Sequence, residues 1–180
     1  MSKLCLGAIV LAVMLSATTA QAKGRDCHAM ATKALKFSDE TKPDEFVVES
    51  IGSTCDQARV TIYVRTVESG WFPLLISEVS AFGGVVKNHG EMAKAIKEIA
   101  DRIEPPQRAN LESWEDLQKA GSQPEGNPWR GTPLIQAEYV RLFKQKPRFV
   151  IIPTDAARGK MVVWDDAIFG RPVDYVFYGD

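Results

Sequence analysis

An alternation of apolar and polar residues in the segment 57–66 constrains the fold more than any other feature of the sequence. The alternating side chains are, in order, Ala58, Arg59, Val60, Thr61, Ile62, Tyr63, Val64 and Arg65. A period of two over this length is typical of a half-buried strand. The segment 46–51 is also rich in strand-forming residues, and the residues 52–56 between the two runs are typical of a turn. We therefore predict a β-hairpin.

The first 22 residues have the pattern of a secretory signal peptide. A positive charge at Lys3 precedes an apolar run at 4–15, and the small-x-small motif Ala20-Gln21-Ala22 follows. We expect cleavage after this motif, which leaves residues 23–180 as a single globular domain that is periplasmic or secreted. An uncleaved signal anchor is the alternative. After the signal segment, the sequence contains no run long and apolar enough to span a membrane.

Two of the three cysteines, Cys27 and Cys55, belong to the expected mature chain. An exported chain with an even number of cysteines favours a disulfide, and two cysteines allow one pairing. This bond would tie the N-terminal segment to the turn of the predicted hairpin and stabilise the fold by about 3–4 kcal/mol. A metal or redox site is the competing interpretation, but no Cys-x-x-Cys motif occurs and the only histidines are His28 and His89.

The charge balance argues against a nucleic-acid partner. Lysine and arginine number 22, aspartate and glutamate number 23, and the formal net charge is −1. The charges are interspersed, and no basic stripe occurs in the sequence. We therefore predict no binding to nucleic acid or to an anionic membrane surface.

Two segments have clear helical patterns. In 25–37 a set of apolar residues falls near one helical face, so we predict a first helix there. The members of this face are Cys27, Met30, Ala31, Ala34, Leu35 and Phe37. The segment 88–103 is a second predicted helix, since Asn88 is a favourable N-cap and Glu91 completes a capping box. Pro105-Pro106 is expected to end this helix.

Two shorter helices are predicted in the second half of the chain. The third covers 110–120 and ends at Gly121. A loop rich in glycine and proline follows at 121–131. The fourth helix begins after this loop, with Thr132 as its cap and Pro133 at its first position.

The remaining apolar runs predict strands. The segment 71–82 fits both a helix and a strand, and we favour a strand that ends near Val79. Short runs at 149–152 and 161–164 indicate a second hairpin, and 173–178 is a further strand. Helices in the middle of the chain with strands before and after them favour an α+β fold. The simplest packing is one mainly antiparallel sheet with helices packed on one face, stabilised by the disulfide.

Candidate catalytic residues are few. His89 would lie in the first turn of the second helix, where the positive end of the helix dipole favours the neutral imidazole that a general base needs. The alternative is an exposed histidine without a function, and His28 is expected beside the disulfide. The sequence contains neither Gly-x-Ser-x-Gly nor His-Glu-x-x-His. We predict no metal site and no cofactor, and His89 as the one catalytic candidate.

The adjacent carboxylates do not indicate an active site. Glu115-Asp116 and Asp165-Asp166 are neighbours along the chain, whereas two-carboxylate catalysis needs groups that face each other across a substrate. We interpret both pairs as solvated. Gly83-Gly84 is not a phosphate-binding loop, because no lysine followed by serine or threonine occurs in register.

Tryptophan provides the main indication of a binding surface. Trp114 and Trp164 fit positions in the core, and Trp71 fits either the core or the surface. Trp129 lies in the loop 121–131 and is followed by Arg130. Tryptophan and arginine are enriched in interface hot spots, so these two residues are the predicted binding residues. The alternative is that Trp129 packs over the core.

These patterns favour two hypotheses of different classes. The first is an exported non-enzymatic binding, inhibitor or accessory protein of the cell envelope, which uses Trp129 and Arg130 to contact an envelope protein or glycan. The second is a small envelope hydrolase with His89 as general base. Because the sequence contains no complete catalytic set, the first hypothesis is preferred, although such sets can be assembled in space.

Overall fold

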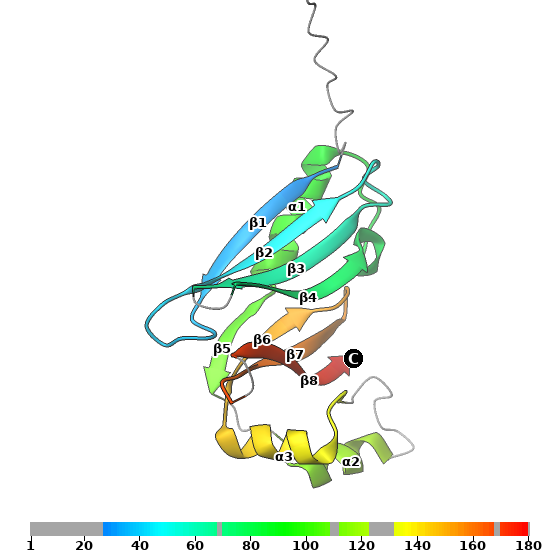
Figure 1. Cartoon of the computed structure of the whole chain (residues 1–180). Helices are drawn as coiled ribbons and strands as arrows, with labels where there is room; N and C mark the ends of the chain where they lie inside the picture. Colours follow the sequence, from blue (N-terminus) through cyan, green and yellow to red (C-terminus); the bar gives the residue numbers. More distant parts are fainter. Residues whose placement is uncertain (1–26, 68–69, 109–111, 123–131, 168–169, 180) are drawn as a thin grey trace, which may run out of the picture.

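The computed structural model describes residues 27–67, 70–108, 112–122, 132–167 and 170–179. In this part of the chain, two four-stranded antiparallel sheets are accompanied by three α-helices (Figure 1). The predicted α+β class and the antiparallel pairing are therefore confirmed. The strands are divided between two sheets, whereas the simplest packing had placed them in one.

The first sheet, sheet A, has its strands in sequence order. They are β1 (Ala29–Leu35), β2 (Asp44–Ile51), β3 (Arg59–Thr66) and β4 (Gly70–Glu78). The predicted hairpin is β2–β3, in which Val47 lies opposite Tyr63. For the ambiguous segment 71–82, the structure confirms the strand, which is followed by a 3₁₀ turn at Val79–Phe82.

The predicted first helix, 25–37, is wrong, because its described residues form β1. Along this strand buried or half-buried residues alternate with exposed ones, and Ala29 is 7% exposed while Met30 is 60% exposed. The apolar residues of this segment fit both a helical face and a half-buried strand. Hydrogen bonding to β2 along the whole of β1 selects the strand, since pairing with a distant segment overrides a local helical pattern.

Helix α1 (His89–Asp101) confirms the second predicted helix and its cap. The Asn88 side chain accepts a hydrogen bond from the backbone N–H of Glu91, and Glu91 in turn accepts from the Asn88 side chain and from the Lys87 N–H. The buried face of α1 includes Met92, Ile96 and Ile99, and it packs on β1 and β2. Local capping and tertiary burial thus favour the same helix.

The second sheet, sheet B, also follows the order of the sequence. Its strands are β5 (Glu104–Arg108), β6 (Arg148–Pro153), β7 (Arg158–Asp165) and β8 (Arg171–Gly179). The predicted hairpin is β6–β7, and β8 is the predicted final strand. Strand β5 was not predicted, because Pro105-Pro106 reads as a helix stop. Proline is nevertheless compatible with β5, which lies at the edge of the sheet.

Helix α2 (Trp114–Ser122) begins and ends later than predicted. Ser113 lies just before it, and its hydroxyl accepts a hydrogen bond from the backbone N–H of Asp116. The helix continues through Gly121, which was expected to end it. The serine cap, and not the residues near 110, therefore sets where the described helix begins.

Helix α3 (Gln136–Gln145) begins after the predicted cap, so the cap at Thr132 is wrong. Ile135 occupies the N-cap position with extended backbone. The Thr132 hydroxyl instead accepts a hydrogen bond from the Leu134 N–H, which closes a local turn before the helix. The side chain of a threonine can bond to nearby backbone in a turn as well as in a helix cap, and here the turn prevails.

Two groups of buried side chains hold the elements together. The larger group joins sheet A, α1 and the β6–β7 hairpin, so that both sheets contribute to one core. Its members include Phe37, Phe46, Ile62, Ile96, Val150, Ile152 and Trp164. The smaller group lies between sheet B and the helices α2 and α3. Its members are Leu117, Tyr139, Leu142, Phe149, Val163, Tyr175 and Val176.

Candidate functional site

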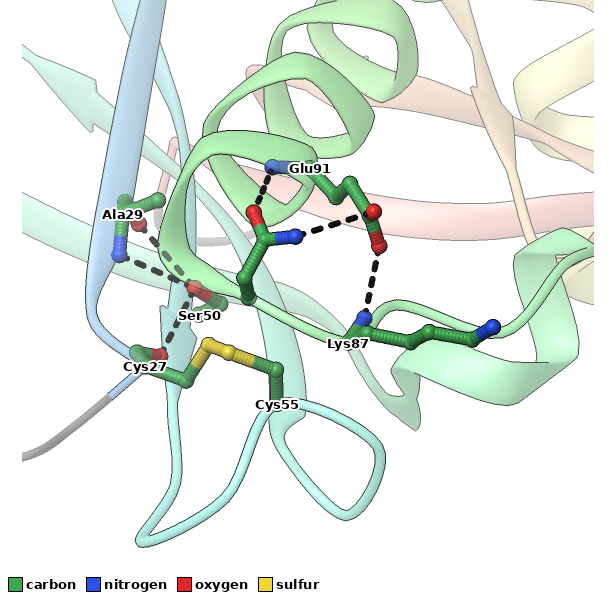
Figure 2. The surroundings of a disulfide bond; sticks show 7 residues. Cys27, Ala29, Ser50, Cys55, Lys87 and Glu91 are labelled. Atoms are coloured by element: carbon green, nitrogen blue, oxygen red, sulfur yellow. Dashed lines mark hydrogen bonds between the residues drawn. A yellow bond between two sulfur atoms is a disulfide. The ribbon is translucent and has the colours of Figure 1, made fainter.

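The predicted disulfide joins Cys27 and Cys55, whose Cα atoms lie 4.9 Å apart (Figure 2). Cys27 comes just before β1, and Cys55 lies in the turn between β2 and β3. The bond therefore ties the start of sheet A to the turn of its central hairpin, as the sequence predicted. Both cysteines are buried.

Hydrogen bonds and close backbone packing reinforce this corner. The buried Ser50 hydroxyl accepts from the Ala29 N–H at 2.9 Å and donates to the Cys27 carbonyl oxygen at 3.2 Å (Figure 2). The Cys27 N–H donates to the carbonyl oxygen of Gly52. A Cβ atom on Gly52 would lie 2.6 Å from the Cα atom of Ala58, so only glycine fits at the start of the turn.

A surface groove of about 500 Å³ runs between this turn and the start of α1. Its lining residues include Ser53, Thr54, Asp56, Val85 and His89. The structure thus places the predicted catalytic candidate His89 in a groove, on the same lining as two hydroxyls and a carboxylate. Within the described residues, however, the exposed imidazole has no hydrogen-bond or ion-pair partner to orient it.

The other histidine, His28, lies just before β1 and contacts a residue of β2. The His28 Nε2 atom lies 2.8 Å from a Glu49 carboxylate oxygen. In the described part of the chain, no three His, Cys, Asp or Glu side chains gather in a way that could hold a metal ion.

The interpretation of both carboxylate pairs as solvated is wrong for Asp165, which is buried. Its carboxylate accepts two hydrogen bonds from the Arg141 guanidinium, at 2.9 and 2.6 Å, and a third from the Ala167 N–H. The hydrogen bond with Asp165 raises the pKa of Arg141. Asp166 and the Glu115-Asp116 pair are exposed. Asp165 therefore fastens α3 to the end of β7.

A second buried charge in sheet B was also missed. Lys160 on β7 is 6% exposed, and its Nζ lies 2.7 Å from the Asp174 carboxylate on β8. The alternation of β7 gives no sign of this burial, because lysine fits an exposed strand position equally well. A buried lysine needs a partner, and the pairing of β7 with β8 places Asp174, which lies opposite Val162, within reach of Lys160.

The face of sheet A opposite α1 is exposed and carries a cluster of large side chains. We call the group formed by Tyr63, Arg65 and Trp71 the aromatic–cation cluster. The Tyr63 and Trp71 ring centroids lie 4.8 Å apart, and the Arg65 guanidinium lies 5.3 Å from the Trp71 ring. Trp71 is 56% exposed, and Ile76 on the same strand is 64% exposed.

The register of sheet A explains how this cluster forms. Arg65 lies opposite Trp71 in the β3–β4 ladder, and Glu45 lies opposite Arg65 in the β2–β3 ladder. The Glu45 carboxylate pairs with the Arg65 guanidinium at 2.6 Å. Burial together with Glu49 and Glu45 raises the pKa of Tyr63, so its hydroxyl stays protonated near neutral pH. The sequence did not decide whether Trp71 lies in the core or on the surface. The polar face of the 57–66 alternation could have indicated its neighbours Tyr63 and Arg65.

Of the remaining tryptophans, two pack in the cores and one lies outside the residues that the structure describes. Trp164 is buried, and its ring makes edge contacts with Phe37 and Phe72, which confirms its core position. Trp114 is partly buried, and its ring lies 5.3 Å from that of Tyr139. The predicted binding residues Trp129 and Arg130 lie outside the described residues, so their role stays a prediction.

No protein-family model, curated protein or solved structure matches the chain. None of the three described helices has the length and apolar character needed to cross a membrane. We therefore infer the function from the described surfaces alone.

Proposed function

We propose that the chain is an exported, non-enzymatic binding protein of the cell envelope, of the inhibitor or accessory kind, and that its partner is another protein. The observation that carries this proposal is the exposed aromatic–cation cluster on sheet A. Trp71 exposes more than half of its surface, and tryptophan, tyrosine and arginine are the residues most enriched in interface hot spots.

The contacts within the cluster also support a binding role. Trp71 rests against Tyr63 and Arg65, and Glu45 holds Arg65 from the other side. Side chains that are already ordered lose little entropy when a partner covers them. The exposed Ile76 extends the apolar area along β4. A folded protein surface with complementary apolar and charged groups fits this mixture.

The loop residues Trp129 and Arg130 remain a proposed second contact. Trp129→Ala is expected to weaken binding and leave the thermal melting temperature unchanged. A lowered melting temperature with unchanged binding would instead assign Trp129 to the core. Comparing this variant with Trp71→Ala shows whether one surface or both contact the partner.

The proposal is tested with Trp71→Ala and the control Ile135→Ala, which removes another exposed apolar side chain, at the N-cap of α3. Proteins that wild type captures from envelope extract are identified, purified and titrated against each variant. We expect Trp71→Ala to cost about 2 kcal/mol or more, a roughly 30-fold weaker Kd, with an unchanged melting curve. The control should bind like wild type.

Two results would contradict this proposal. Equal binding by wild type and Trp71→Ala would show that the aromatic–cation cluster is not part of the interface. Trp71-dependent binding to isolated cell-wall glycan, with no purified protein partner bound, would make the partner a glycan. Aromatic side chains can stack on either class of partner, so both assays are needed.

The groove beside the disulfide supports a second proposed function, in which the protein is a small envelope hydrolase with His89 as general base. The supporting observation is that Ser53, Thr54 and Asp56 line the same groove as His89. Loss of a general base lowers a rate by about a hundredfold or more. We expect His89→Ala to leave both function and melting unchanged. A large loss of function at an unchanged melting temperature would favour the hydrolase.

A further inference from the structure

Three of the four edge strands in the described sheets contain proline. The edges are β1 and β4 in sheet A and β5 and β8 in sheet B. Pro73 lies in β4, Pro105 and Pro106 lie in β5, and Pro172 lies in β8. Proline removes a backbone donor and so discourages the pairing of an edge with another chain. Strand β1 has no proline, and Figure 1 shows it at the border of sheet A.

The register identifies the backbone groups that β1 presents at this border. The Cys27 N–H donates to Gly52, so these two residues form a hydrogen-bonded pair. Such pairs alternate with non-bonded pairs along an antiparallel ladder, and the same register continues through Ala29 opposite Ser50. The backbone groups of Met30, Thr32 and Ala34 therefore point away from β2. The side chains of these residues are exposed, and no other bond of their backbone is seen in the described structure.

Lys33 is the one charged residue of β1, and an inward-pointing charge can protect an edge from pairing. In this structure its ammonium group is already engaged. The Nζ atom donates to the carbonyl oxygens of Asp101, at 2.9 Å, and Ile103, at 2.6 Å, at the end of α1. An added strand would therefore not strip Lys33 of its hydrogen bonds.

We propose that β1 pairs antiparallel with β1 of a second copy of the chain, about a twofold axis at Thr32. In this register Thr32 lies opposite its own counterpart, and Met30 lies opposite Ala34 of the second copy. Each of these pairs exchanges two backbone hydrogen bonds. The two A sheets then form one continuous sheet, whose outer face carries two aromatic–cation clusters.

The composition of β1 favours a second copy as the occupant. The outward-facing side chains near the axis, Thr32 and Ala34, are small, so two strands approach without steric conflict. Lys33 lies opposite Ala31 of the second copy, so no like charges face each other directly. An interface in which the same patch serves both subunits is the commonest form of oligomer. The dimer does not depend on the proposed function, because Trp71 lies on β4, at the opposite edge of sheet A.

Sedimentation velocity of the purified protein from about 1 µM to about 1 mM tests the dimer. We expect the dimer fraction to rise with concentration. Thr32→Lys and Thr32→Glu should each weaken dimerisation by about tenfold or more, because like charges then face each other across the axis. An equimolar mixture of the two variants should restore the dimer. Thr61→Lys on β3, which changes the same face away from the edge, is the control.

A protein that stays monomeric at every concentration would overturn the proposal. A dimer whose affinity is unchanged by both Thr32 substitutions would overturn it as well, because the contact would then lie elsewhere. Thermal melting of each variant shows that it is folded. If the Thr32 variants fail to fold, an equimolar mixture of Ala34→Lys chains with Met30→Glu chains should dimerise more tightly than either variant alone, because opposite charges then face each other across the axis, and an equal affinity would overturn the proposal.

Discussion

Sheets A and B have the same strand order and the same number of strands, but their helices are fastened by different interactions. Helix α1 lies on sheet A through an apolar face, and its first turn is capped by its own neighbours in sequence. Helix α3 lies on sheet B through Leu142, through the stacked rings of Tyr139 and Tyr175, and through the ion pair of the half-buried Arg141 with the buried Asp165. A disulfide adds to the packing of sheet A, whereas an ion pair adds to the packing of α3 on sheet B.

The comparison shows which kind of stabilisation can be recognised before the structure is known. An apolar helical face and a capping box are formed by residues of one continuous segment, so α1 was predicted correctly. Arg141 and Asp165 are separated by 24 positions, and nothing in their local sequence pairs them. Burial of such a pair adds directional hydrogen bonds, but it makes the helix sensitive to loss of either partner.

Loss of the disulfide should have the largest effect and should fall on sheet A. Replacing Cys27 and Cys55 by alanine is expected to lower the free energy of unfolding by about 3–4 kcal/mol, because the unfolded chain is no longer closed across 28 positions. Urea denaturation measures the change. Intact mass with and without reduction and alkylation tests the bond itself, and two freely alkylated thiols in unreduced folded protein would contradict it.

Loss of the buried ion pair should affect sheet B by a slightly smaller amount. Asp165→Ala is expected to cost about 2–3 kcal/mol, since it removes a buried carboxylate and leaves the half-buried Arg141 guanidinium without both hydrogen bonds. Hydrogen exchange should show the loss of protection in α3 before α1. Asp166→Ala, at the exposed neighbour, is the control, and an equal effect of both substitutions would argue against the pair.

The helix caps provide a third comparison of the two sheets. Asn88→Ala should cost about 1 kcal/mol, because it removes the acceptor for the Glu91 N–H at the start of α1. Asn88→Ser keeps an acceptor and should restore most of this loss. Thr132→Ala should cost less than about 0.5 kcal/mol, because Thr132 closes a turn and does not cap α3. Thermal melting of the three variants checks the order.

The smallest expected effect is a pH dependence at Asp39, in the loop between β1 and β2. The hydroxyl and then the N–H of Thr41, followed by the Lys42 N–H, lower the pKa of Asp39 from 3.8 to about 2. A carboxylate with a lowered pKa adds stability above its unfolded pKa, and that contribution is lost as the pH falls from about 4 to 2.

NMR titration of the Asp39 carboxyl should find the pKa near 2 in wild type. Thr41→Val removes the hydroxyl, the largest of the contributions, and should raise this pKa toward 3.8. A wild-type value that does not change in Thr41→Val would assign the shift to other groups.

The sequence predicts the candidate surfaces less completely than it predicts the fold. It identified His89 and the disulfide corner separately, but not that both border one groove. It left Trp71 unassigned, because exposure of a strand residue depends on which face the neighbouring helix covers. The cluster of Trp71 with Tyr63 and Arg65 requires the β3–β4 register, and a bulge in that ladder changes which residues face each other.

The sequence by itself determined the α+β class, the β2–β3 hairpin, the capped helix α1 and the pairing of Cys27 with Cys55. The class, the hairpin and the helix follow from short-range periodicity and from local hydrogen bonds between side chains and backbone. The disulfide follows because the two cysteines of the expected mature chain allow only one pairing. Only the tertiary structure decided that β1 is a strand, that the strands form two sheets, and that Asp165 is buried. Each of these depends on hydrogen-bond partners far away in the chain, and a local pattern carries no information about where such partners lie.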